Sequence, residues 1–275
     1  MKSRIVLYCV FGGLAMSIVA SGIGHFFWWG LSGVVMAASF VPIALFGPRR
    51  LAGQLGVVLP VLFIVTVLCT WSEALFFFPS PEMRQRAMSD LQGELIIYLI
   101  VGTALAVLAV ALKLGRDSAY SVKMRPPSSL VMMALVAGLV YLCFYLVTGG
   151  ITYQFFTKQY YPDAPQIAMR IGAWFWVMQF GRGLLMALAV LPAICTLRMS
   201  RMNSAIAIGL LVWVAGGLAL LIPPNQLLGP TQRFIHTIEI LTQNFPLGFA
   251  TTLLMRPKAT AASNVGAMPA AQAHT

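Results

Sequence analysis

Long apolar runs follow one another along almost the whole chain, separated by short polar segments. Eight runs can be drawn, at about 5–25, 31–46, 55–78, 94–113, 128–149, 170–197, 203–222 and 233–255. About 20 apolar residues suffice for one helical crossing of a bilayer. The pattern therefore predicts an all-α fold, a polytopic transmembrane helix bundle of about eight spans that forms a single domain over residues 1–258.

Composition indicates the same class of protein. Of the 275 residues, 59% are apolar and only 9% are charged, whereas soluble domains carry about 25% charged residues. This contrast excludes a soluble enzyme, a DNA-binding domain and a secreted scaffold. Residues 259–275 are rich in alanine and poor in large apolar side chains, and we predict that they form a disordered cytoplasmic tail.

The basic residues fall in alternate connections between the apolar runs. Twelve of the 18 lysines and arginines lie at the start of the chain, in every second loop and just after the last run. Loops held on the cytoplasmic side of a membrane show this enrichment. We therefore predict a protein of the plasma (inner) membrane whose N- and C-termini are both cytoplasmic. The net charge of +11 is then explained by topology, and no nucleic-acid partner is expected. A cleaved signal peptide over the first run is the alternative for the N-terminus.

Two of the runs carry small residues at helical spacing. These are Gly13, Ser17 and Ser21 in the first run, and Gly209, Gly216 and Gly217 in the seventh. Small side chains let two helix backbones approach closely in lipid, so both faces are predicted to be helix-packing surfaces.

The eighth run carries a line of polar side chains. Gln232, His236, Glu239 and Gln243 fall on one face of the predicted helix, with Arg233 beside them. Ionisable groups are costly in lipid and by default face other helices or a cavity. We therefore expect this face to be buried against something polar.

Two other runs contribute charged residues to the outer half of the membrane and to its centre. Gln179 and Arg182 are neighbours on one face of the sixth run, and Arg182, twelve residues past Arg170, should lie near the middle of the bilayer. Glu73 lies near the outer end of the third run. Together these residues predict one outward-facing polar pocket, with its floor near Arg182, lined by Glu73, Gln179, Arg182, Arg233, His236, Glu239 and Gln243. The alternative is that the balanced charges are structural and fix the helix register, with no ligand.

Three functions fit such a pocket. The preferred one is binding or transport of a small polar or anionic ligand, in which Arg182 and Arg233 hold the negative group and His236 and Glu239 carry a proton. The second is an intramembrane enzyme acting on a lipid or lipid-linked substrate, with His236 as general base and Glu239 as its orienting partner. These two are only candidate catalytic residues, because no nucleophile motif is present. The third is an accessory or structural subunit without a ligand.

The expected partners follow from the membrane location. They are membrane lipid and, as alternatives, a second copy of the chain or another membrane subunit. No cofactor and no metal is assigned. A metal site is the weaker hypothesis, since its ligands would come from several helices, as His25, Glu73, Glu94, His236 and Glu239. The segment 150–166 is rich in tyrosine and phenylalanine and is predicted to be an interfacial loop, a lid or a docking surface.

Overall fold

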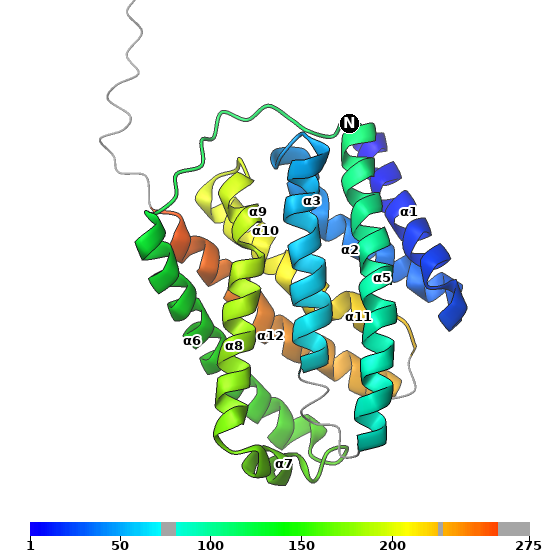
Figure 1. Cartoon of the computed structure of the whole chain (residues 1–275), viewed down its shortest axis with the longest axis vertical. Helices are drawn as coiled ribbons and strands as arrows, with labels where there is room; N and C mark the ends of the chain where they lie inside the picture. The colour runs from blue at the N-terminus through cyan, green and yellow to red at the C-terminus, as the bar shows by residue number, and fades with distance from the viewer. Residues whose placement is uncertain (73–80, 225–227, 258–275) are drawn as a thin grey trace, which may run out of the picture.

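A computed structural model describes residues 1–72, 81–224 and 228–257, and this part of the chain is mainly helical and contains no strands. Figure 1 shows the arrangement of the helices. In chain order these are α1 (Lys2–Val19), the 3₁₀ turn η1 (Ser21–Ile23), α2 (Phe26–Phe46), α3 (Leu51–Pro60), the π-helix η2 (Val61–Leu68), α5 (Pro81–Ala111), α6 (Pro127–Thr152), the π-helix η3 (Tyr153–Thr157), α7 (Ala164–Ile171), α8 (Ala173–Ala189), α9 (Leu191–Thr196), α10 (Arg201–Trp213), the π-helix η4 (Val214–Leu218), α11 (Ala219–Leu221) and α12 (Pro230–Met255).

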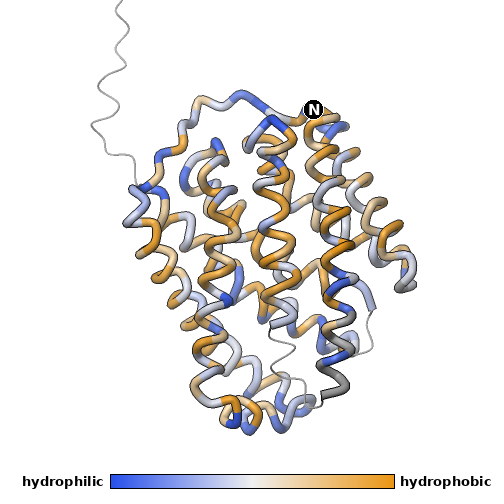
Figure 2. The backbone as a smooth tube through the Cα atoms, in the orientation of Figure 1, coloured by the Kyte–Doolittle hydropathy of each residue, from blue (hydrophilic) through white to orange (hydrophobic). Residues whose placement is uncertain are grey.

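The prediction of a polytopic membrane bundle is confirmed. In the described part of the chain, seven helical stretches are long and apolar enough to cross a membrane, and apolar positions line the helices in Figure 2. The eighth predicted run is α12, which has 26 residues and is therefore about 39 Å long. It is long enough to span but more polar than the other seven, which agrees with the predicted count of about eight.

The helices run alternately between two ends of the bundle (Figure 1). One end holds residues 1–4, 47–50, 112–126, 197–201 and 256–257, and we call it the basic end because most of the lysines and arginines lie there. Backbone hydrogen bonds tie its segments together, from Arg116 N to Leu45 O, from Arg198 N to Phe46 O and from Arg125 N to Met255 O. The alternation predicted from the loop charges is thus present in the fold.

Several predicted boundaries were wrong by a few residues. Helix α2 begins at Phe26, so residues 26–30 extend the second run. The sixth run is divided at Gly172, whose φ of 63° turns the chain between α7 and α8. Arg170 therefore belongs to the short helix α7 and not to the span. The predicted loop 150–166 is partly helical, because α6 continues to Thr152 and η3 to Thr157. Residues 73–78 of the third run and the tail 259–275 lie outside the described residues.

Close helix contacts form at the predicted small residues. A Cβ on Gly13 would lie 2.8 Å from the carbonyl oxygen of Gly30 in α2, and the Ser17 hydroxyl donates to Phe26 O over 2.9 Å. Ser21 does not share this face, since it lies in η1 and is exposed. In the seventh span, a Cβ on Gly217 would lie 2.6 Å from Ile240 of α12. Glycine thus sets the distance between α1 and α2 and between η4 and α12.

Arginines satisfy the last carbonyl groups of α12 at the basic end. The C-terminal carbonyls of a helix have no partners within the helix, and cations there are favoured by the helix dipole. Arg201 donates to Leu253 O and, from Nε over 2.6 Å, to Arg256 O. Arg125 donates from Nε to Leu254 O over 2.6 Å. The loop arginines therefore anchor the end of α12 as well as contributing positive charge.

We expect Arg201→Gln to lower the free energy of unfolding by about 1–2 kcal/mol, because two charge-assisted hydrogen bonds to α12 are lost. Unfolding in mixed detergent and dodecyl sulfate micelles, followed by circular dichroism, measures the change. The matched control is Arg50→Gln, which removes an exposed charge from the same end and should change stability by less than about 0.5 kcal/mol. Equal losses in the two variants would contradict the anchoring role.

Candidate functional site

A continuous line of hydrogen bonds follows one face of α12. The Gln232 side-chain amide donates to the Tyr161 hydroxyl over 3.4 Å, and that hydroxyl lies 3.3 Å from His236 Nε2. His236 Nδ1 lies 2.9 Å from Glu239 Oε2, and Gln243 Nε2 donates to Glu239 Oε1 over 3.3 Å. The four α12 residues predicted to form a polar face therefore do so, and Tyr161 joins them. We call these five residues the α12 polar line.

The partners define the direction of each hydrogen bond. A carboxylate only accepts hydrogen bonds, so Glu239 accepts one from the imidazole N–H at Nδ1 and one from the Gln243 amide. In the tautomer that carries its hydrogen on Nδ1, the His236 imidazole accepts at Nε2 from the Tyr161 hydroxyl. This arrangement orients the imidazole and leaves its Nε2 at the point where α12 meets the segment that follows η3.

Tyr161 is positioned by a turn at the end of η3. Its backbone N–H donates to Thr157 O, and its carbonyl accepts from the N–H of Ala164 at the start of α7. Burial raises the pKa of Tyr161 above its ordinary value of 10.0, an effect opposed by the hydrogen bond from Gln232 and reinforced by the charge of Glu239. The phenol therefore stays protonated at neutral pH and can donate to His236.

Sequence reasoning did not include Tyr161 among the site residues. The available signal was the aromatic density of segment 150–166, which does not indicate which of its rings faces inward. Phe155 and Phe156, a few residues earlier, are strongly exposed. Only the turn after η3 distinguishes Tyr161 from them.

A second polar group lies between α8 and α6. Arg182 donates from Nη1 to Gln179 Oε1 over 2.8 Å, and its guanidinium carbon lies 5.8 Å from the centre of the Tyr141 ring. Arg182 is only 8% exposed, and Gln179 and Tyr141 are buried. Counted from Ala173, where α8 begins, Arg182 lies about 14 Å along the span. The predicted neighbours Gln179 and Arg182 are thus in contact inside the bundle.

One face of α6 joins the two polar groups. Tyr141 contacts Arg182 of α8, and two turns later a Cβ on Gly149 would lie 3.6 Å from both Glu239 and Gln243 of α12. Tyr145 lies between them on this face, with its ring centre 5.9 Å from that of Tyr141. Eight residues of helix separate Tyr141 from Gly149, so the two groups are about 12 Å apart along α6.

The remaining predicted site residues behave differently. Arg233 is turned toward α11, where its Nη1 donates to Leu221 O and Ile222 O over 3.3 and 3.1 Å. Arg233 therefore satisfies carbonyl groups at the C-terminal end of α11. Its buried Nε has no hydrogen-bond partner among the described residues. Glu73 lies outside the described residues. Glu94 accepts a hydrogen bond from Trp71 over 2.8 Å, and His25 is an exposed residue before α2.

The geometry limits the chemistry that these residues can perform. His236 and Glu239 can hold and pass a proton, because an imidazole bonded to a carboxylate can gain or lose one at Nε2. In the part of the chain that the structure describes, no three histidine, cysteine or acidic side chains come close enough to share a metal ion. Two hollows in the described surface lie at the basic end and not beside the α12 polar line.

Comparison with known proteins gives no indication of function, so a function can be inferred only from the geometry of the site. Neither the protein-family models, the curated proteins nor the solved structures match this chain.

Proposed function

We propose that this multi-pass helical membrane protein binds a small polar or anionic molecule and transports it across the bilayer, with His236 and Glu239 as the proton-carrying pair. The observation that carries the proposal is the α12 polar line, a connected set of hydrogen bonds on the most polar of the eight long helices. Intramembrane carboxylate and imidazole groups connected in this way are typical of proton relays in transporters.

Partial exposure of the pair favours a functional role over a purely structural one. The side chains of His236 and Glu239 are 24% and 16% exposed, whereas Arg182 is nearly sealed. A sealed ion pair serves to fix the packing of helices, but a partly exposed pair can exchange protons with water or meet a ligand. Gln232 and Gln243 donate hydrogen bonds on either side of the pair, to the Tyr161 hydroxyl and to Glu239 Oε1.

In this proposal the basic end faces the cytoplasm of a plasma-membrane protein, since lysine and arginine are retained on that side. The α12 polar line then lies toward the outside, where segment 153–172 closes over it. Arg182 and Gln179, about 12 Å deeper along α6, would form the floor of the pocket, and Arg182 would supply the positive charge for an anionic group. A second copy of the chain or another membrane subunit would complete a bundle of this size.

The test is proton-coupled uptake into proteoliposomes that contain a trapped pH-sensitive dye. A panel of small carboxylates and phosphate esters is applied outside, and acidification of the vesicle lumen is recorded. At least one anion class should acidify the vesicles with the wild-type protein. Glu239→Gln keeps the size and most hydrogen bonds of the side chain but cannot carry a proton, and it should reduce acidification to that of empty vesicles.

The matched control is Asp163→Asn, which removes an exposed carboxylate two residues from Tyr161 without altering the α12 polar line. It should retain wild-type acidification. If Glu239→Gln transported as well as the wild type, the pair would not carry the proton. If no member of the panel were transported by the wild type, the transport proposal would be rejected.

One observation favours an enzyme as the second candidate. The order Glu239, His236, Tyr161 places a carboxylate on one imidazole nitrogen and a hydroxyl on the other, which is the arrangement that orients a general base. A lipid or lipid-linked substrate would reach it from the membrane. Release of a labelled head group that stops in a folded His236→Ala variant, with no vesicle acidification by the wild type, would favour this reading over transport.

A further inference from the structure

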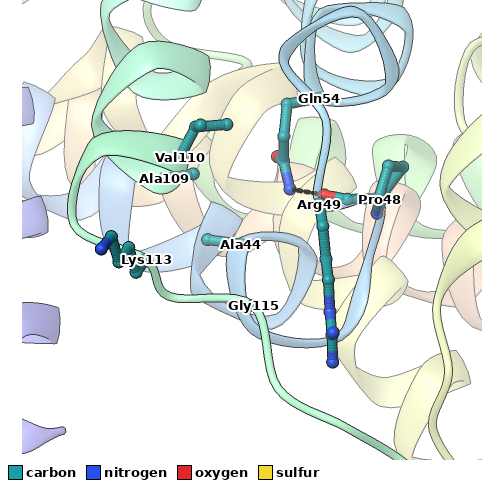
Figure 3. A pocket seen from close by; sticks show the side chains of 8 residues that line it. All are labelled: Ala44, Pro48, Arg49, Gln54, Ala109, Val110, Lys113 and Gly115. Atoms are coloured by element: carbon teal, nitrogen blue, oxygen red, sulfur yellow. Dashed lines mark hydrogen bonds between the residues drawn. The ribbon is translucent and has the colours of Figure 1, made fainter.

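A hollow of about 190 Å³ lies at the basic end, between the end of α2, the start of α3 and the end of α5 (Figure 3). It has room for several water-sized groups. Its walls are apolar at Ala44, Ala109 and Val110, and cationic at Arg49 and Lys113. None of its lining residues belongs to the α12 polar line or to the Gln179–Arg182 group.

The Lys113 side chain lines the hollow, and the backbone of Lys113 has an unusual conformation. Its φ is 49°, in the left-handed region that disfavours residues other than glycine. Its N–H donates to Val110 O, and the next N–H, of Leu114, donates to Ala109 O. This is the pattern that ends many helices with glycine. A lysine at this position retains local strain, and such strain is found mainly where a side chain is needed.

Arg49 is fixed on the other side of the hollow. A Cβ on Gly115 would lie 2.9 Å from Arg49 Cγ, so the chain after α5 passes directly beside the arginine stem. The guanidinium group forms an ion pair with Asp117, which is itself almost fully exposed. Asp117 therefore neutralises part of the positive charge, while Arg50 and Arg116 nearby in the chain are exposed and add to it.

Gln54 contributes a polar wall of a different kind. Its amide Nε2 donates to Pro48 O, as drawn in Figure 3, and to Ile43 O. Neither bond uses Oε1, so the side chain presents an acceptor suited to a hydroxyl group. The hollow therefore combines two cations, one acceptor and an apolar wall.

The position of the hollow relates it to the membrane surface. Ala109 and Val110 belong to the last turn of the span 90–111, and Gln54 belongs to the first turns of the span 51–72. Val110 is 37% exposed, so the apolar wall continues onto the outer, lipid-facing surface of the bundle. A molecule seated here would place an anionic group between Arg49 and Lys113 and its apolar part along Val110.

We propose that this hollow binds the phosphate group of an anionic, hydroxyl-bearing head group, with phosphatidylglycerol as the probe of that chemistry. Basic pockets between transmembrane helices bind anionic lipid head groups in this way. Arg49 and Lys113 contact the phosphate, Gln54 accepts a hydrogen bond from a head-group hydroxyl, and the acyl chains leave past Val110. A free phosphate ester shares the same chemistry, and the test separates the two sources.

The experiment is native mass spectrometry of the full chain in detergent, with dioleoyl-phosphatidylglycerol or dioleoyl-phosphatidylcholine added. Wild-type protein should retain phosphatidylglycerol about tenfold more strongly than phosphatidylcholine. The double variant Arg49→Gln/Lys113→Gly should reduce this preference to less than about twofold. Glycine is chosen at position 113 because it suits the left-handed backbone, and the variant should therefore remain folded.

The matched control is Lys2→Gln/Lys123→Gln, which removes two exposed charges from the same end but outside the hollow. It should keep the full preference. Equal losses in the two double variants would overturn the site in favour of general attraction to the basic end. Equal retention of the two lipids by the wild type would also overturn it.

One further variant and one competition measurement extend this test. Asp117→Asn removes the competing carboxylate and leaves both cations, so it should strengthen retention of phosphatidylglycerol about threefold or more; weaker retention would contradict the assigned role of Arg49. Excess inorganic phosphate distinguishes the sources. Retention unaffected by phosphate identifies the lipid as the occupant, and displacement together with a higher melting temperature of lipid-free protein identifies a free phosphate group.

Discussion

Replacing Arg182 by methionine should lower the free energy of unfolding by about 3 kcal/mol, since a buried polar contact is broken on one side only. The substitution removes the hydrogen bond that Gln179 accepts and the cation above the Tyr141 ring. Methionine has a similar length and helix propensity, so the loss reports on the polar contacts and not on a cavity. Unfolding in mixed micelles followed by tryptophan fluorescence measures it.

A double variant distinguishes polar pairing from simple packing. In Gln179→Leu/Arg182→Met both partners become apolar, and replacing both sides of a buried polar pair is often close to neutral. The double variant should therefore recover about 1–2 kcal/mol of the loss. Arg170→Met, on the exposed face of α7, is the control and should change stability by less than about 0.5 kcal/mol. A loss for Arg182→Met as small as that of the control would show that Arg182 does not stabilise the α6–α8 contact.

The membrane class of this chain could be predicted from sequence because lipid imposes two simple rules. Each span needs about 20 apolar residues, and basic loops stay on one side. The positions of Arg49, Arg125 and Arg201 followed from these rules. What the rules do not contain is the second role of the arginines, since only the folded chain brings Arg125 and Arg201 to the last carbonyls of α12.

Local backbone geometry was not predictable in the same way. The apolar pattern continues through Gly172, yet its φ of 63° ends one helix and begins another. Pro60, which lacks an N–H, is followed by the π-helix η2, and the periodicity of the sequence does not distinguish α-helix from π-helix over so few residues. The pattern therefore located the spans but not the turns that divide or distort them.

The polar face of α12 was predictable because it depends on one helix alone. Gln232, His236, Glu239 and Gln243 follow helical spacing, and the structure connects them. Tyr161 and Arg233 depend on other elements. The first is brought in by the turn after η3, and the second, only 100° around the helix from Gln232, is directed to the carbonyls that end α11.

The close approach of α12 to α10 makes Gly248 a position where one added methyl group should have a large effect on stability. A Cβ there would lie 2.7 Å from Ile208 O and 3.0 Å from Gly209 Cα. Both neighbours are backbone atoms, which cannot turn aside as a side chain can. We expect Gly248→Ala to force the two helices apart and to lower the free energy of unfolding by about 3 kcal/mol, measured in the mixed-micelle assay.

The opposite sign is expected at a glycine with free space around it. Gly56 lies inside α3, and no atom would lie within 4 Å of an added Cβ. Gly56→Ala should therefore raise stability by about 0.5–1 kcal/mol through helix propensity alone. Because the same methyl group is added in both variants, the difference in sign isolates the backbone contact. Displacement of α12 should also weaken the link between Tyr161 and His236, so Gly248→Ala should lose vesicle acidification that Gly56→Ala retains. Equal stabilities for the two variants would mean that α10 and α12 are not in backbone contact at Gly248.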